Sequence, residues 1–97
     1  MAKNPFDLTG RVALITGGNG GIGLGMGEAI AAAGGDVCIW GRNEEKNAEA
    51  LARLKEVGNG KNYEAFVCDV TNEEDVDRRF AETLEAFGRV DGLFANA

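Results

Sequence analysis

The stretch RVALITGGNGGIG, residues 11–23, decides the fold of this chain. It joins a short, continuous apolar run to a segment in which more than half of the residues are glycine. A continuous apolar run of this kind is typical of a strand that is covered on both faces. Glycine loses the most conformational freedom on folding, so a cluster of glycines needs a specific use. We therefore expect a buried strand over residues 11–16, followed by a turn whose backbone something else approaches closely.

The residues after this turn have the spacing of a helix. Its expected apolar face consists of Ile22, Met26, Ile30, Ala29 and Ala33. The pair of glycines at 34–35 is expected to end it. A glycine-rich loop that leads into a helix N-terminus presents unpaired N–H groups to an anion, and no side chain holds the anion away. The loop therefore predicts a phosphate-binding site.

The rest of the chain repeats the alternation of strand and helix. Further strands are expected at DVCIW (36–40), at YEAFVCDV (63–70) and from VDGLFANA (90–97). One helix between them is capped by Asn43, ends at Gly58, and has an inner face of Ala48, Leu51 and Leu54. The other begins with a Thr71–Glu74 capping box, ends at Gly88, and carries Val76, Phe80, Leu84 and Phe87. The order β-α-β-α-β-α-β predicts a doubly wound, Rossmann-type α/β fold. Its parallel sheet should have strand order 3-2-1-4 and be incomplete on the fourth-strand side.

Composition excludes several classes of function. The 97 residues fit one domain, and the net charge of −6 argues against nucleic acid or an anionic membrane as a partner. No apolar run approaches the roughly 20 residues that cross a bilayer, and the start lacks an apolar signal core, so we expect a cytoplasmic protein. Cys38 and Cys68 lie in expected strands and should be reduced core thiols. The sequence has no histidine and no serine, which excludes a Ser-His triad and a His-ligated metal.

The glycine loop fits two binding patterns. GxGxxG, read from residue 18, is the general dinucleotide fingerprint, and TGxxxGxG, read from residue 16, is a longer variant. The first pattern predicts an acidic residue at the end of the second strand, where it would bind the ribose hydroxyls. The sequence there reads WGRN, with Gly41 and Arg42 in place of an acid.

Three motifs in order give the sequence a resemblance to a known family. LTGRVALITGGNGGIG, CDVTNEEDV and LFANA resemble the first strand and cofactor loop, the end of the third strand, and the Asn-Asn-Ala-Gly motif of short-chain dehydrogenases/reductases. Ala95 stands where that last motif has its first asparagine. The resemblance covers essentially all 97 residues and corresponds to the N-terminal, cofactor-binding part of the family.

The resemblance assigns roles within the glycine loop. It implies that Gly17 makes the turn, that Gly21 admits the pyrophosphate and that Gly23 lets helix and strand pack closely. Asn19 and Ile22 would line the same loop.

The resemblance also assigns roles at the other strand ends. Asp69 would bind the adenine amino group, Val70 would flank the ring, and Asn96 would close the cofactor site near the ribose. Gly41 occupies the position where NAD-preferring members carry an acid, and Arg42 follows it. Because an arginine fork suits a 2′-phosphate, we expect NADP as the cofactor, with NAD as the alternative. The sequence departs from the pattern of NADP-preferring relatives at one loop position. Many of those relatives carry a basic residue there, and this sequence has Gly20.

The resemblance implies hydride transfer between a nicotinamide and an alcohol or carbonyl substrate. The family uses a serine, a tyrosine and a lysine four residues after that tyrosine. Here serine is missing, and the only tyrosine, Tyr63, is followed four residues later by Val67. We therefore expect a dinucleotide-binding segment over residues 1–97 that is inactive by itself. We expect the remaining catalytic segment, or another subunit, to complete the enzyme. The complete enzyme is expected to be a homo-oligomer.

Two alternatives compete with this hypothesis. One is a stand-alone nucleotide-binding or regulatory module without catalysis. The other is a fragment of an S-adenosylmethionine methyltransferase, which also has a glycine-rich loop after its first strand. The WGRN sequence lacks the acid that such an enzyme usually needs at the end of its second strand.

Overall fold

The computed structural model describes residues 7–96, and within them strands and helices alternate as expected. The strands are β1 (Val12–Thr16), β2 (Asp36–Gly41), β3 (Tyr63–Val67) and β4 (Gly92–Ala95). The helices are α1 (Gly21–Ala32), α2 (Glu44–Val57) and α3 (Glu73–Phe87). Ala97, at the end of the expected fourth strand, lies outside the described residues.

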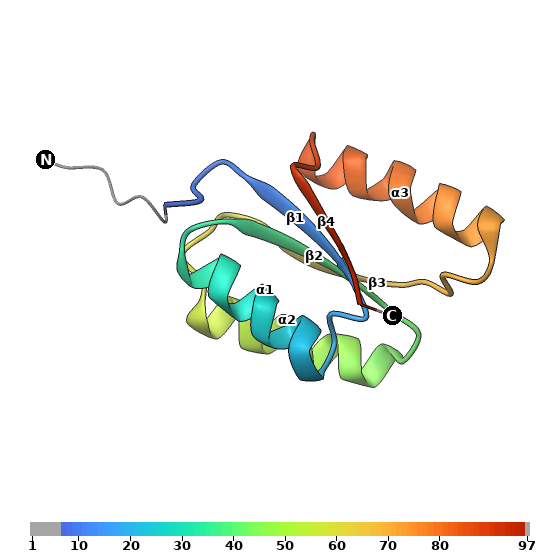
Figure 1. The fold of residues 1–97 in the computed structure, drawn as a ribbon, viewed down its shortest axis with the longest axis horizontal. Coiled ribbons are helices and arrows are strands. Elements are labelled where there is room, and N and C mark those ends of the chain that lie inside the picture. The colour runs from blue at the N-terminus through green and yellow to red at the C-terminus, as the bar shows by residue number, and fades with distance from the viewer. Residues whose placement is uncertain (1–6, 97) are drawn as a thin grey trace, which may run out of the picture.

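The strands form one parallel sheet in the order β3-β2-β1-β4, which confirms the predicted topology. α1 and α2 cover one face of the sheet and α3 lies on the other (Figure 1). β1 is central, and its register places Ile15 beside Ile39 of β2 and Phe94 of β4. All of β1 is buried, which is why its sequence is continuously apolar rather than alternating. None of the helices in residues 7–96 has the length and apolar character that crossing a bilayer requires.

The helix ends follow local sequence signals, with one correction. Asn43 caps α2, because its side chain accepts a hydrogen bond from the backbone N–H of Lys46 at 3.0 Å. The predicted Thr71–Glu74 capping box is wrong: the N-cap of α3 is Asn72, which accepts from the N–H of Asp75 at 3.0 Å. The Thr71 hydroxyl is already engaged, because it donates to the Asp69 carboxylate at 2.6 Å.

The sheet-facing side of α1 also differs from the expected stripe. The buried residues of α1 are Gly23, Gly27 and Ala31, whereas Ile22 is 78% exposed. The small residues let the helix lie close to the sheet, where a Cβ at position 27 would be 3.3 Å from Leu54 and 3.5 Å from Ile15. Met26 and Ile30 pack at the side of this core. The apolar spacing therefore predicted the helix correctly but not the face that it buries.

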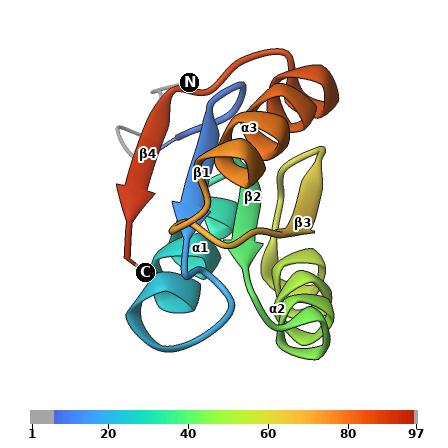
Figure 2. The ribbon, with the colours of Figure 1, turned by 90° about the vertical axis from the view of Figure 1, so that its right-hand side faces the viewer.

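The other two helices bury polar residues among their apolar ones. α2 buries Asn47 and Ala50 with Leu54, while the expected inner-face residue Ala48 is exposed. α3 buries Thr83, whose hydroxyl accepts from the indole N–H of Trp40 at 3.1 Å. Phe80 and Leu84 of α3 stay 40% exposed, and Leu93 of β4 is 61% exposed. In Figure 2, α3 stands before the middle of the sheet and leaves β4 at the edge.

Candidate functional site

The glycine loop lies at the carboxyl end of the central strand. β2 and β3 lie to one side of β1 and β4 lies to the other, so the strand order reverses at β1. In open α/β sheets, ligands bind at such a switch point, beyond the carboxyl ends of the strands. Gly17 has φ 66° and Gly21 has φ 56°, which residues with a Cβ rarely adopt. The backbone N–H of Gly17 donates to the carbonyl of Trp40 at 2.8 Å, which ties the loop to β2.

The start of α1 carries no side-chain cap. Its N-cap is Gly20, no side chain accepts a hydrogen bond from the first turn, and that turn contains no acidic residue. α2 and α3 both begin with an asparagine cap and with acidic residues in the first turn. The N–H groups and the positive end of the dipole of α1 are therefore left to an anion.

Gly23 is required by close packing beneath the loop. A Cβ at this position would overlap the carbonyl oxygen of Gly17 and lie 2.7 Å from the Asn96 side-chain nitrogen. Asn96 approaches from the end of β4: its side-chain Nδ2 donates to the Gly17 carbonyl at 3.4 Å, and its backbone N–H donates to the Thr16 hydroxyl at 3.2 Å. The close packing at Gly23 and the hydrogen bonds of Asn96 therefore hold the loop in place on the side of α1 and β4.

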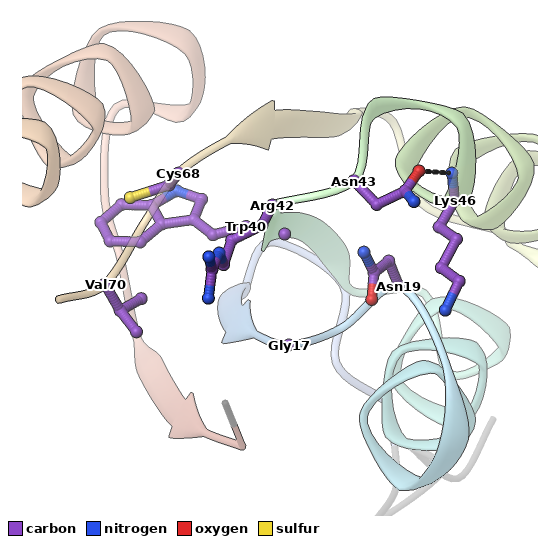
Figure 3. Close-up of a pocket in the computed structure, with 9 residues that line it drawn as sticks. Gly17, Asn19, Trp40, Arg42, Asn43, Lys46, Cys68 and Val70 are labelled. Carbon is purple, nitrogen blue, oxygen red and sulfur yellow. Dashed lines mark hydrogen bonds between the residues drawn. The ribbon is translucent and has the colours of Figure 1, made fainter. Parts of the chain in front are cut away.

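A pocket of about 250 Å³ opens beside this loop (Figure 3). It lies among the glycine loop, the ends of β2 and β3, and the first turn of α2. Its lining residues are Gly17, Asn19, Trp40, Gly41, Arg42, Asn43, Lys46, Cys68 and Val70. The lining holds two cations, Arg42 and Lys46, and no acidic residue. Within residues 7–96 neither cation forms a salt bridge. The pocket therefore suits an anionic group.

Asp69 lies between two lining residues, Cys68 and Val70, in the segment that follows β3. Its Oδ1 accepts from the backbone N–H of Thr71 at 3.0 Å and from the Thr71 hydroxyl at 2.6 Å. These hydrogen bonds, mainly that from the hydroxyl, lower the pKa of Asp69, and Arg42 contributes in the same direction. Asp69 is therefore an ionised acceptor near neutral pH.

The predicted residues separate into four groups. Gly17, Asn19, Arg42 and Val70 line the pocket. Gly23 and Asn96 support the loop from beneath, and Gly21 and Ile22 are exposed at the start of α1. Asp69 adjoins the lining without being part of it.

Sequence reasoning missed two polar residues of α2. Lys46 lines the pocket from the first turn, and Asn47 is buried behind it. A signal for Asn47 was available, because it precedes Leu54 by seven residues and so shares the helix face that packs on the sheet. A polar residue on such a face needs partners. Lys46 had no comparable signal beyond its place three residues after the Asn43 cap.

The remaining reactive side chains have structural surroundings. Cys38 and Cys68 are free and buried, as expected, and burial raises the pKa of the Cys38 thiol to about 12. The Tyr63 hydroxyl accepts from the backbone N–H of Gly60 at 2.6 Å, at the opposite end of the sheet from the pocket. No group of three or more acidic or cysteine side chains in residues 7–96 is arranged to hold a metal ion. The site is therefore equipped to bind and orient an anionic ligand.

Comparisons with known proteins agree on one family. The sequence model described as short chain dehydrogenase matches residues 11–97. Sorbose reductase SOU1 of Candida albicans is 41% identical over 92 residues, which cover 95% of this chain and 32% of that protein. This chain spans about a third of the length of the curated relatives that it matches.

Solved structures give the same result. NAD+-bound xylitol dehydrogenase matches with a TM-score of 0.88 at 36% identity, over 93% of this chain and 34% of that one. The RhlG/NADP active-site complex of Pseudomonas aeruginosa matches with a TM-score of 0.86 at 33% identity, over 98% of this chain and 38% of that one.

Proposed function

Because this chain belongs to the short-chain dehydrogenase family, we propose that it is the cofactor-binding part of an oxidoreductase. The enzyme would transfer hydride between a nicotinamide cofactor and an alcohol or carbonyl substrate. The observation that carries this proposal is the uncapped start of α1 at the switch point of the sheet. Membership of this family leaves no role for the methyltransferase alternative.

The residues fit a dinucleotide of the NAD(P) type. The bare N–H groups at the start of α1 would hold the diphosphate, and Gly21 keeps the approach to them open. Asn19 would contact the adenosine ribose, and Val70 would flank the adenine. The ionised carboxylate of Asp69 can accept a hydrogen bond from an amino group. Asn96 would act indirectly, because its side-chain amide donates to the Gly17 carbonyl and so holds the glycine loop in place.

We propose NADP rather than NAD as the cofactor. The 2′-phosphate of NADP is an additional dianionic group on the adenosine ribose, whereas NAD has a hydroxyl there. Arg42 lines the pocket without a salt-bridge partner among the described residues, and its guanidinium can donate two hydrogen bonds to one phosphate. No acidic residue lines the pocket to accept a hydrogen bond from a ribose hydroxyl.

In this proposal the chain binds and orients, and the bound nicotinamide supplies or accepts the hydride. The family's serine and its tyrosine-lysine pair have no counterparts in these 97 residues. Tyr63 is engaged by the Gly60 backbone away from the pocket. We therefore assign proton transfer and substrate contacts to the remaining part of the protein. Exposed Phe80, Leu84 and Leu93 offer that part an apolar surface to cover.

Isothermal titration of the protein with NADP and with NAD tests this proposal. We expect saturable binding of both, with NADP tighter by about tenfold or more, because a hydrogen bond to a charged group contributes about 1.5–3 kcal/mol and a tenfold change in affinity corresponds to about 1.4 kcal/mol. Arg42→Ala should remove most of that preference. Arg53→Ala is the matched control, because Arg53 pairs with Glu28 away from the pocket. Absence of binding by either dinucleotide would refute the function, and an unchanged preference in Arg42→Ala would remove that residue from the site.

A further inference from the structure

Asn47 is a buried amide that joins three parts of the pocket. Only 3% of the residue is exposed. Its Nδ2 donates to the carbonyl of Gly41, at the end of β2, at 3.0 Å, and to the carbonyl of Phe66, in β3, at 3.3 Å. Its Oδ1 accepts from the Nδ2 of Asn19, in the glycine loop, at 2.9 Å. One side chain of α2 therefore holds two strand ends and the loop together.

The orientation of this amide is fixed by its partners. A flipped amide would place Oδ1 against the carbonyls of Gly41 and Phe66, which cannot donate a hydrogen bond. The amide nitrogen must therefore face the two strands, and the oxygen must face Asn19 and the space above Gly41. Rotating the side chain away would break its hydrogen bonds to both carbonyls and to Asn19, although the Gly41 carbonyl also accepts from the backbone N–H of Cys68 at 3.2 Å.

This orientation explains the glycine at position 41. A Cβ built on Gly41 would overlap Asn47 Oδ1 and Asn19 Nδ2. Its backbone φ is not positive, so the conformation itself does not require glycine. The space for a side chain is filled by the two hydrogen-bonded amides. Asn19 is half-buried and can move, but Asn47 is held by three hydrogen bonds.

We propose that Asn47 is a positioning residue that determines which dinucleotide the pocket accepts. It fills the space that a side chain at position 41 would need, and so it excludes a carboxylate from the end of β2. A carboxylate there would accept hydrogen bonds from ribose hydroxyls and repel a 2′-phosphate. With that place closed, Arg42 and Lys46 are the only charged groups in the lining. This inference rests on the proposed function.

Lys46, the neighbour of Asn47 in sequence, contributes to the same proposed cofactor specificity. It precedes Asn47 on α2, and its backbone N–H is held by the Asn43 cap at 3.0 Å. Figure 3 shows its side chain extending from α2 toward the glycine loop and Asn19. The Asn47 anchor thus places a second cation on the side of the pocket opposite Arg42. Two cations without an acidic neighbour in the lining select for a phosphomonoester over a hydroxyl.

A double-mutant cycle in the full-length protein tests this inference. The variants are Gly41→Asp, Asn47→Ala and the combination of the two, each titrated with NAD and with NADP and melted without ligand. Gly41→Asp alone should lower the melting temperature and weaken both dinucleotides by about tenfold or more, because the new side chain meets Asn47. The combined variant should bind NAD about tenfold more tightly than Gly41→Asp does, and should prefer NAD over NADP.

The matched control is Asn62→Ala combined with Gly41→Asp. Asn62 also donates from its amide to a backbone carbonyl, that of Ala86 at 3.0 Å, but at the opposite end of the sheet. The Asn62→Ala substitution should restore neither the melting temperature nor the NAD affinity of Gly41→Asp. If the aspartate variants do not fold, Gly41→Ala in the same cycle still tests the overlap. Its loss of melting temperature should be smaller in the Asn47→Ala background than in the wild type.

The outcomes separate this inference from the proposed function. If Gly41→Asp alone gained NAD affinity at an unchanged melting temperature, Asn47 would exclude nothing and the inference would be wrong. Additive losses across the cycle would overturn it equally. If the wild type bound neither dinucleotide, the proposed function would fail, and the assignment of specificity would fall with it. The coupling in melting temperature would still report whether Asn47 fills the space.

Discussion

The starts of α1 and α3 are opposite solutions to one problem, which is how to satisfy the first N–H groups of a helix. α3 begins with the Asn72 cap and three acidic residues, Glu73, Glu74 and Asp75. α1 begins at Gly20 with neither a side-chain cap nor an acidic residue. Both helices follow a strand end at the same edge of the sheet (Figure 2). The contrast supports the proposal that the open end of α1 binds an anion, because the starts of α2 and α3 are capped by side chains and that of α1 is not.

The third residue of each helix sharpens this contrast. In α3 it is Asp75, whose carboxylate accepts from the backbone N–H of Asp69 at 2.8 Å and so binds the helix to its own loop. In α1 it is Gly23, where the backbone of Gly17 occupies the place of a side chain. Side chains cap the start of α3, whereas at the start of α1 the loop backbone takes the place of a side chain and the first N–H groups stay uncapped.

The largest effect is expected from Gly23→Ala. The added methyl group would overlap the Gly17 carbonyl, so the loop must shift, and we expect NADP affinity to fall about a hundredfold, or roughly 2.7 kcal/mol. Gly25→Ala in the same helix is the control, because a Cβ there meets no atom within 4 Å. That variant should bind normally and melt slightly higher. Equal affinities of the two variants would contradict the importance of the close packing.

Gly20→Asp would convert the start of α1 into one like that of α3. A Cβ at position 20 has free space, and aspartate is a favourable N-cap that also suits the helix dipole. We expect stability to rise by up to about 1 kcal/mol and NADP affinity to fall about tenfold, since the carboxylate competes with the diphosphate. Gly20→Asn supplies a neutral cap as control. If both substitutions left the affinity intact, the anion would not bind here.

Asn72→Ala tests the closed helix start. Removing the cap leaves the N–H of Asp75 without its partner, and we expect a loss of about 1 kcal/mol in unfolding free energy. Dinucleotide affinity should stay within twofold, because Asn72 is not among the residues that line the pocket. Urea denaturation and calorimetric titration measure the two quantities. A marked loss of affinity would show that the α3 start also takes part in binding.

The smallest effect concerns acid stability at the same helix start. The hydrogen bond from Arg78, and next the N–H of Asp69, lower the pKa of Asp75 below its ordinary value of 3.8. Asp75 therefore adds stability above about pH 4 that is lost as the pH falls through its depressed folded pKa. Asp75→Asn should flatten the decline of stability below pH 4, followed by urea midpoints between pH 2 and pH 7. An unchanged pH dependence would assign the decline to other carboxylates.

The sequence predicted the alternation and order of the strands because each signal was local. A continuous apolar run, an Asn43 cap or a Gly88 stop depends on few neighbours. Which face of a helix is buried depends on the distance to the sheet, and this is why the glycine side of α1 replaced the side carrying Ile22. The capping box failed for a different, local reason, since the Asp69 carboxylate, two residues earlier, accepts from the Thr71 hydroxyl.

The site was predictable where the backbone itself forms it. The glycine spacing located the loop, and the WGRN sequence located Arg42 at the pocket. The sequence analysis did not identify Asn47, because its three hydrogen-bond partners come from three different segments that sequence spacing alone does not bring together. The sequence showed that Gly41 stands where an acidic residue was expected. The physical reason is found only in the structure, where the amides of Asn19 and Asn47 occupy the space of a Cβ at position 41.

The central claim is that the open start of α1 seats the diphosphate of a dinucleotide. The most direct measurement is a titration of isotope-labelled protein with NADP, following backbone amide signals by NMR. The account predicts the largest shifts at residues 17–23, with a second group around Arg42, and little change at the capped start of α3. Shifts confined to α3 or β4, or an unperturbed glycine loop at saturation, would contradict it.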